Sequence, residues 1–185
     1  MFVKKSAFTL IELLIVVAII AILAAIALPN FLEAQTRSKV SRAKSDLRTL
    51  ATALEAYNVD NNCYLPVPFA LGPRFRRMRP LTTPISYITT IPLDPFESTD
   101  PNGEGNFRRG LYSYGATPIE KASRWALASD GPDRNESCDG LVFYPGYSPS
   151  LFDGTNTEFK FVRYDPTNGT ISRGDILRMS DYRND

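Results

Sequence analysis

The densest group of side chains that could bind a metal lies in the segment SDGPDRNESCDG, residues 129–140. Calcium takes about six to eight oxygen ligands in flexible geometry, and a turn-rich loop with several carboxylates can supply them. The spacing is not that of an EF-hand, so the alternative is a polar surface loop capped by its own Asp and Asn side chains. The candidate calcium ligands are Asp130, Asp133, Asn135, Glu136 and Asp139.

Other chemistry is largely excluded by composition. The chain contains no histidine, which rules out Ser-His-Asp and Cys-His catalysis and histidine-ligated zinc. No recognisable nucleophile or phosphate-binding loop lies near the acidic segment, so we do not expect an enzyme. Cys63 and Cys138 are too few for a four-thiolate site. In an exported domain they could form one disulfide, or they could remain two separate thiols.

A long apolar run follows the first residues. Residues 8–28 are apolar apart from Thr9 and Glu12. A helix over this range is about 31 Å long, the thickness of a bilayer core. Lys4 and Lys5 precede the run, so the positive-inside rule predicts a cytoplasmic N-terminus. The run is too long for an ordinary secretory signal and has no small-x-small cleavage site at its end, which leaves a simple membrane anchor as the main alternative.

Glu12 distinguishes a simple anchor from an assembling subunit. A carboxylate in a membrane helix costs about 2.5–3.5 kcal/mol on insertion scales, and such groups usually have a function and a nearby cation. A cut between Ala7 and Phe8 would create an α-amino cation within the membrane zone. Pairing of that cation with Glu12 of a neighbouring copy would occur in only one axial stagger. Glu12 is therefore predicted to set the register of a helical assembly.

The residues around this position resemble a known processing site. Lys4-Lys5-Ser6-Ala7, followed by Phe8-Thr9-Leu10-Ile11-Glu12, is similar to the site cleaved in type IV prepilins and type II secretion pseudopilins. The resemblance implies cleavage before Phe8 by a prepilin peptidase, N-methylation of Phe8, and the register role of Glu12. The family usually has glycine before the cut, whereas this chain has Ala7, so processing could be slower.

Pro29 lies inside the long helix that the sequence predicts. Proline removes one backbone hydrogen bond and clashes with the preceding turn, so we expect a kink or loosening there. Apolar residues then recur at helical spacing from Val40 to Tyr57, which predicts an amphipathic continuation over residues 29–62. The other positions are mostly charged, with a basic bias. We interpret them as a solvated face rather than a site for DNA or lipid phosphate.

The composition changes at the start of the segment 63–185, which we expect to form a globular head. Residues 65–101 are rich in proline, which predicts a turn-rich connection with a short helical turn around residues 84–87. Trp125 and Leu127 are expected on one face of a strand. Short strands are predicted at residues 110–115, 124–129, 141–144 and 169–177. We therefore expect an α+β fold, in which a long N-terminal helix packs on a small antiparallel sheet. The first half of this helix is expected to lie in the membrane, and the second half is expected to be amphipathic.

The head also resembles the major pseudopilin of type II secretion. YITTIPLDPF, residues 87–96, is similar to that family's proline-rich connection, and WALASDG, residues 125–131, to its strand leading into an acidic glycine loop. The resemblance implies a structural calcium in this loop. The expected divisions are a prepilin leader (1–7), a membrane and polymerisation helix (8–28), its amphipathic continuation (29–62) and the head (63–185).

These features together predict a structural subunit of a type II secretion pseudopilus. The implied partners are further copies of the chain, the prepilin peptidase, an inner-membrane assembly platform and minor pseudopilins. The implied location is the bacterial inner membrane, with the head periplasmic or extracellular. The alternatives are a major or minor type IV pilin of a surface pilus, acting in adhesion, motility or DNA uptake, and a membrane-tethered binding module that does not polymerise. A net charge of +1 gives no reason to expect nucleic acid as a partner.

Overall fold

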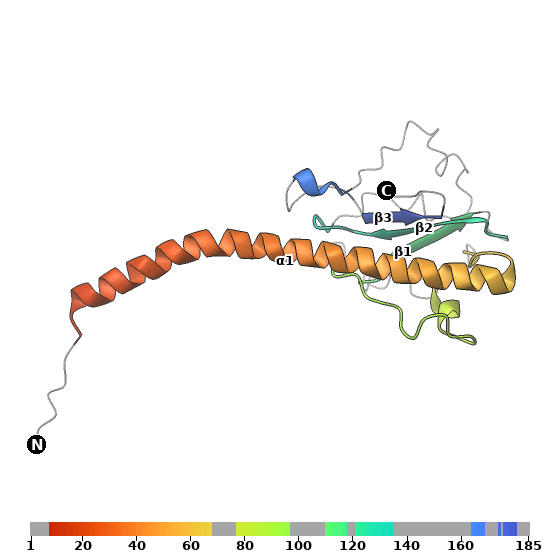
Figure 1. Cartoon of the computed structure of the whole chain (residues 1–185), viewed down its shortest axis with the longest axis horizontal. Helices are drawn as coiled ribbons and strands as arrows, with labels where there is room; N and C mark the ends of the chain where they lie inside the picture. The colour runs from red at the N-terminus through yellow and green to blue at the C-terminus, as the bar shows by residue number, and fades with distance from the viewer. Residues whose placement is uncertain are drawn as a thin grey trace, which may run out of the picture. The chain divides into compact units, whose positions relative to one another are not determined.

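The chain forms two compact units, Met1–Arg37 and Ser38–Asp185, and one long helix contributes to both. The computed structural model describes residues 8–67, 77–96, 110–117, 121–134, 164–168, 174 and 176–180. The elements, shown in Figure 1, are α1 (Leu10–Asn61), η3 (Arg79–Leu81), β1 (Ser113–Thr117), β2 (Arg124–Ser129), η4 (Pro166–Asn168) and β3 (Ile176–Met179).

The prediction of one continuous N-terminal helix is confirmed by α1. The helix begins at Leu10, two residues after the expected start, and ends at Asn61, one residue before the expected end. Asn62 follows with a φ of 54°, the left-handed conformation that commonly ends helices. The helix is continuous through Pro29, and the predicted kink there stays a prediction.

In the second unit, the amphipathic part of α1 forms one side of the hydrophobic core. Its buried residues recur at the predicted helical spacing and lie on one face. They pack against buried side chains from the sheet and from the proline-rich connection. The buried residues of α1 are Val40, Ala43, Leu47, Leu50, Ala51, Ala53 and Leu54.

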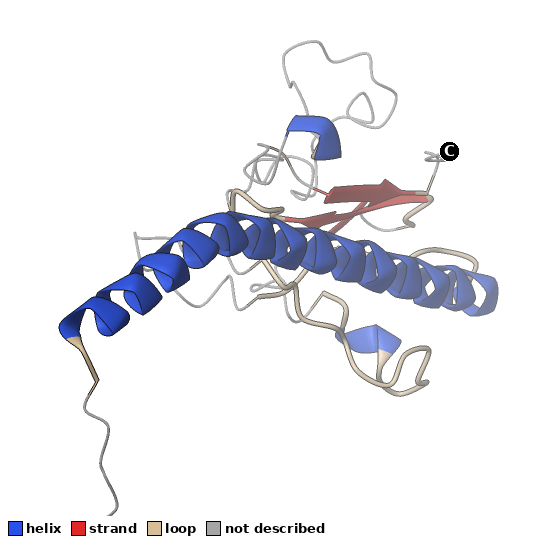
Figure 2. Cartoon of the chain, turned by 60° about the vertical axis from the view of Figure 1, so that its left-hand side comes forward, coloured by secondary structure: helices blue, strands red, loops and turns tan. Residues whose placement is uncertain are grey.

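The sheet packed on this helix has three antiparallel strands in the order β1-β2-β3. Tyr114 of β1 pairs with Leu127 of β2, and Ala128 of β2 pairs with Leu177 of β3. Figures 1 and 2 show the sheet on one side of this part of α1 and η3 on the opposite side. The predicted α+β arrangement of a helix on a small antiparallel sheet is therefore confirmed.

The prediction of a short helical turn at residues 84–87 is wrong in position. The turn forms instead at η3, where Pro80 occupies its first turn and the amide of Thr82 donates to the carbonyl of Arg79 at 2.9 Å. Proline suits a first helical turn because its fixed φ is already helical and its missing N–H would be unpaired there. Pro84 follows a cis peptide bond in a non-helical bend.

The predicted strands are partly confirmed. Strand β2 matches residues 124–129, and Trp125 and Leu127 both enter the core, although Ala126 and Ala128 on the other face are buried as well. Strand β1 begins at Ser113 rather than residue 110. The earlier residue Leu111 makes an isolated bridge to Leu93 instead. Strand β3 overlaps only the end of the predicted 169–177 segment, and residues 141–144 lie outside the described part of the chain.

Candidate assembly site

The start of α1 is organised by a reciprocal pair of side chains, Thr9 and Glu12. The backbone N–H of Thr9 donates to Oε2 of Glu12 at 2.8 Å, and the Thr9 hydroxyl donates to the same oxygen at 2.7 Å. The backbone N–H of Glu12 donates back to Oγ1 of Thr9 at 3.3 Å. This arrangement is a capping box, in which Thr at the N-cap and Glu three residues later satisfy each other's backbone donors.

The capping box gives Glu12 a partner within its own chain. The sequence Thr9-Leu10-Ile11-Glu12 carries the T-x-x-E signal for this motif, and the prediction of a lone carboxylate in need of a cation missed it. Phe8, at the predicted cleavage point, is 75% exposed. Ala7, the residue before the predicted cut, lies outside the described residues.

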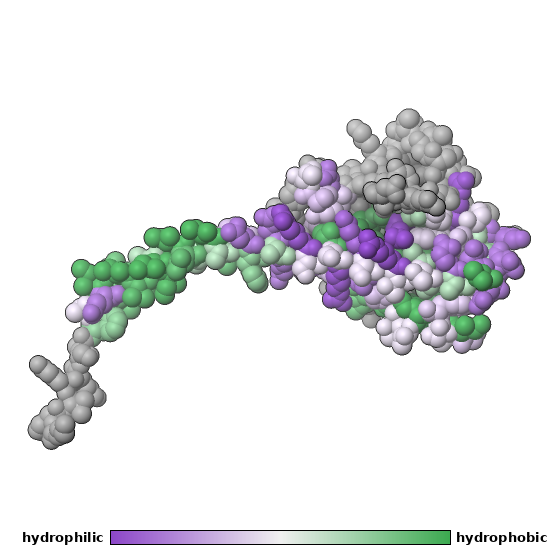
Figure 3. Space-filling model, in the orientation of Figure 1, coloured by the Kyte–Doolittle hydropathy of each residue, from purple (hydrophilic) through white to green (hydrophobic). Residues whose placement is uncertain are grey.

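The apolar part of α1 presents hydrophobic side chains all round. By length and composition, α1 is one helix that could cross a membrane, and the apolar stretch within it is not buried inside the chain. Figure 3 shows hydrophobic residues covering the visible face of this part of the helix. A helix that is hydrophobic on every side must bury its surface in lipid or against other helices. Its exposed large side chains include Leu13, Leu14, Ile19, Ile20, Ile22, Leu23 and Ile26.

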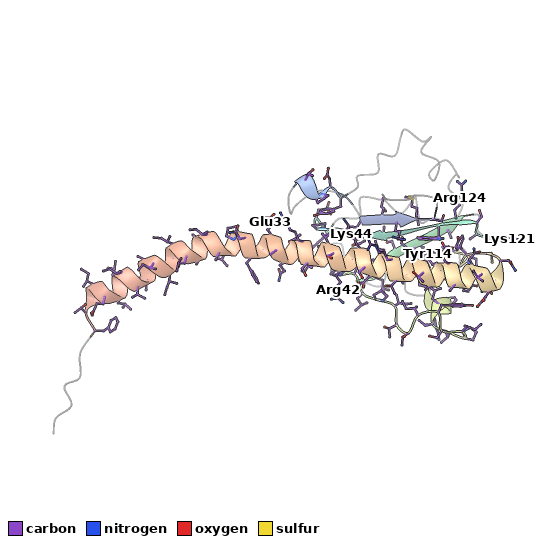
Figure 4. The ribbon with its side chains drawn as sticks, in the orientation of Figure 1. Glu33, Arg42, Lys44, Tyr114, Lys121 and Arg124 are labelled. Atoms are coloured by element: carbon purple, nitrogen blue, oxygen red, sulfur yellow. The ribbon has the colours of Figure 1, made fainter. Side chains whose placement is uncertain are left out.

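The charged face of α1 is partly neutralised by the chain itself. Arg37 pairs with Glu33, and Nε of Arg42 lies 3.8 Å from Oδ2 of Asp46. The same Asp46 oxygen accepts a hydrogen bond from the buried Tyr112 at 2.9 Å. Burial, followed by this hydrogen bond to Asp46, raises the pKa of Tyr112 above its usual range. Figure 4 shows Arg42 projecting from the helix beside the head, in keeping with a solvated face.

A second carboxylate on α1 fixes the aromatic part of the head. The indole N–H of Trp125 donates to Oε1 of Glu55 at 3.2 Å, and the hydroxyl of Tyr64 donates to Oε2 at 2.9 Å. The two rings meet edge to face, with centroids 6.4 Å apart. Tyr114 lies between the sheet and α1 (Figure 4), and its hydroxyl donates to the carbonyl of Leu65 at 2.8 Å. These contacts position the sheet on the helix.

The start of the acidic loop is held by Asp94, a residue for which we predicted no structural role. Oδ1 of the buried Asp94 accepts the amide of Phe96 and the hydroxyl of Ser129, both at 2.9 Å. Its Oδ2 accepts the amide of Asp130 at 3.2 Å. One carboxylate therefore joins the proline-rich connection to the end of β2, immediately before the segment predicted to bind calcium.

Of the five candidate calcium ligands, the structure describes two. Asp130 and Asp133 flank the turn at Gly131, and Oδ2 of Asp133 accepts the amide of Gly174 at 3.3 Å. Within the described residues, no group of three or more His, Cys, Asp or Glu side chains could hold a metal ion. The donors that would complete a calcium shell, Asn135, Glu136 and Asp139, lie outside the described residues.

The predicted disulfide stays a prediction. Cys63 is half-buried just after the end of α1 and has no disulfide partner among the described residues. Its proposed partner, Cys138, lies in the part of the chain that is not described.

Comparison with known proteins identifies a motif at the N-terminus and relatives that match longer stretches of the chain. Residues 3–28 match the family model described as the prokaryotic N-terminal methylation motif. The chain is 33% identical over 129 residues to type II secretion system core protein G of Pseudomonas aeruginosa, covering 65% of this chain and 89% of that protein. It is 32% identical over 98 residues to the Aeromonas hydrophila protein of the same name, covering 50% and 68%.

The similarity to pilins is shorter. The type IV major pilin protein PilA of Myxococcus xanthus is 54% identical over 61 residues, which cover 33% of this chain and 28% of that pilin. No solved structure gives a significant match. The similarity to core protein G is lower in identity but extends over twice as many residues and most of that protein. The chain therefore belongs to the family of type II secretion system core protein G, the major pseudopilins of the type IV pilin-like class.

Proposed function

We propose that this protein is the structural subunit of a type II secretion pseudopilus. It is made as a prepilin, cut between Ala7 and Phe8, N-methylated at Phe8, and polymerised through the apolar part of α1. The observation that carries this function is a helix exposed on all sides with a carboxylate, Glu12, at its start. The match to the N-terminal methylation motif and the long similarity to core protein G support it.

The geometry at Glu12 is suited to setting the axial register between neighbouring subunits. Both hydrogen bonds from Thr9 go to Oε2, and a carboxylate has capacity for further donors at its second oxygen. The α-amino group released at Phe8 of a neighbouring copy would pair there. An ion pair in a low-dielectric environment is strong only at close range, so axial slips of one turn, about 5.4 Å, would break it.

Replacement of Glu12 by Gln separates this function from simple helix capping. Gln serves as well as Glu at the third position of a capping box, but it carries no charge to pair with an amine. We expect Glu12→Gln to insert in the membrane and to be cleaved, yet to leave few subunits in sheared filaments. Glu12→Asp, which keeps the charge with a shorter reach, is the matched control and should retain part of the assembly. Normal filaments from Glu12→Gln would reduce Glu12 to a cap and overturn the register model.

A type IV pilin of a surface pilus is the second candidate, favoured by the short, high-identity match to the Myxococcus xanthus pilin. That match spans 61 residues, whereas the match to core protein G of Pseudomonas aeruginosa spans 129 residues, more than the helix alone could supply. Complementation of a secretion-deficient strain lacking its own core protein G distinguishes the two. Restored secretion supports the pseudopilus, and surface filaments without secretion support the pilus. A subunit that is processed but never cross-links to its copies would be a membrane-tethered binding module.

The finer assignments form part of the same proposal. The apolar helix and the methylation motif support an inner-membrane subunit with a cytoplasmic N-terminus and its head on the far side. The working partners would be other copies, the prepilin peptidase, the assembly platform and minor pseudopilins. We also propose calcium in the acidic loop, where Asp130 and Asp133 already lie on one turn and carboxylate oxygens are the ligands that calcium prefers.

A further inference from the structure

Within the described residues, Thr9 donates the hydrogen bonds that the Glu12 side chain accepts. Its backbone N–H and its hydroxyl both donate to one oxygen, Oε2, at 2.8 and 2.7 Å. The amide of Glu12 returns a bond to the Thr9 hydroxyl oxygen at 3.3 Å. A glutamate side chain has three rotatable bonds, and two donors on the same oxygen favour the orientation it has over the first turn.

These bonds matter because of where Glu12 has to reside. A carboxylate in the membrane zone is costly, and hydrogen bonds to a charged oxygen are about twice as strong as neutral ones. The bonds from Thr9 are formed within one chain, so they are available while a subunit is still alone in the bilayer. They also direct both donors to Oε2, so Oε1 is the oxygen that a second donor can approach.

We propose that Thr9 is a positioning residue for subunit assembly. It satisfies one oxygen of Glu12 in the unassembled subunit and presents the other to the incoming α-amino group of a second copy. This inference rests on the proposed function, because it assumes that Glu12 pairs with that amine. Hydroxyl chemistry at residue 9, rather than side-chain size, is the requirement.

The test compares Thr9→Val, which keeps the shape and removes the hydroxyl, with Thr9→Ser, which keeps the hydroxyl. Full-length protein is expressed with its assembly machinery, and membrane insertion, cleavage and the filament fraction per cleaved subunit are measured. We expect about tenfold fewer subunits in filaments for Thr9→Val, equivalent to about 1.4 kcal/mol. Thr9→Ser should assemble within about twofold of wild type.

A second measurement reports on Glu12 directly. The carboxyl ¹³C signal of Glu12 is recorded by NMR on the unassembled full chain in detergent micelles. We expect Thr9→Val to move this signal and Thr9→Ser to leave it near the wild-type position, because only the hydroxyl variant keeps the side-chain bond. If the Thr9 hydroxyl does not bind Glu12 in the membrane-embedded chain, the carboxyl signal will be the same in wild type and in Thr9→Val.

Each outcome decides between the two proposals. Normal assembly of Thr9→Val beside failed assembly of Glu12→Gln refutes the role of Thr9 and leaves the register model standing. Equal losses in Thr9→Val and Thr9→Ser also refute it, because the hydroxyl would then be irrelevant. An unmoved Glu12 signal in Thr9→Val refutes positioning even if assembly falls. Normal assembly of Glu12→Gln refutes the function on which the inference rests.

Discussion

Glu55 is predicted to stabilise the head through its two hydrogen bonds to aromatic side chains. It lies on the exposed side of α1 and accepts the indole N–H of Trp125 at 3.2 Å and the hydroxyl of Tyr64 at 2.9 Å. Trp125 is only 2% exposed, so Glu55→Ala would leave its N–H buried without this acceptor. That loss costs about 1–3 kcal/mol, and the more accessible Tyr64 bond adds up to about 1 kcal/mol. Together these terms predict that Glu55→Ala lowers the free energy of unfolding by about 1–4 kcal/mol.

The measurement is a urea titration of the full chain in detergent, followed by the fluorescence of Trp125, the only tryptophan in the sequence. Near-UV circular dichroism gives a second probe of the same transition. Glu55→Gln keeps one acceptor oxygen and should lose about half as much. Glu33→Ala is the matched control, because Glu33 pairs with Arg37 on an exposed part of the helix and should change stability by at most about 0.5 kcal/mol. Equal unfolding midpoints for Glu55→Ala and Glu33→Ala would refute the reasoning.

Three further predictions concern the head. The pKa of Tyr112 is raised in the folded chain, so its contribution to stability is complete below the ordinary tyrosine pKa of about 10 and is lost as pH rises above it. Tyr112→Phe should reduce this loss of stability at alkaline pH, measured by a pH series of unfolding curves. Gly131 has a φ of +71°, and a Cβ there would lie 2.4 Å from the carbonyl oxygen of Gly174, so Gly131→Ala should destabilise the head by at least about 1–3 kcal/mol in the same urea assay. Calcium at about 100 times its Kd should stabilise chelator-treated protein by about 2.7 kcal/mol, and a melting temperature unmoved by calcium would contradict the calcium site. Asp130→Asn should remove that response.

The helix could be predicted from the sequence because its signals are local. Apolar residues at helical spacing from Val40 to Leu54 specify which face is buried, and the turn-forming residues 60–62 (Asp-Asn-Asn) specify where the helix ends. Strand β2 was equally predictable, since its run of aromatic and aliphatic residues is bounded by turn signals. In each case the information lies within a few residues of the feature it determines.

Contacts between distant segments could not be predicted in this way. Asp94 binds Ser129 and Asp130, more than thirty positions along the chain, and nothing near LDPF indicates those partners. The start of β1 was mispredicted for the same reason. Leu111 forms a bridge with the distant Leu93 rather than extending the strand. The turn at η3 was a local error, since Pro80 offered the same first-turn signal as Pro84 and only the packing of Leu81 in the core distinguishes them.

The capping box alters the argument that first pointed to Glu12. The cost of a carboxylate in the membrane suggested that it needs a cation, but the structure shows that Thr9 already satisfies part of that need within one chain. Burial cost alone therefore no longer implies a second subunit. What still does is the charge, because a capping box accepts Gln as readily as Glu. A filament that tolerates Gln needs only a cap, whereas one that requires Glu uses the negative charge to recognise the amine of Phe8.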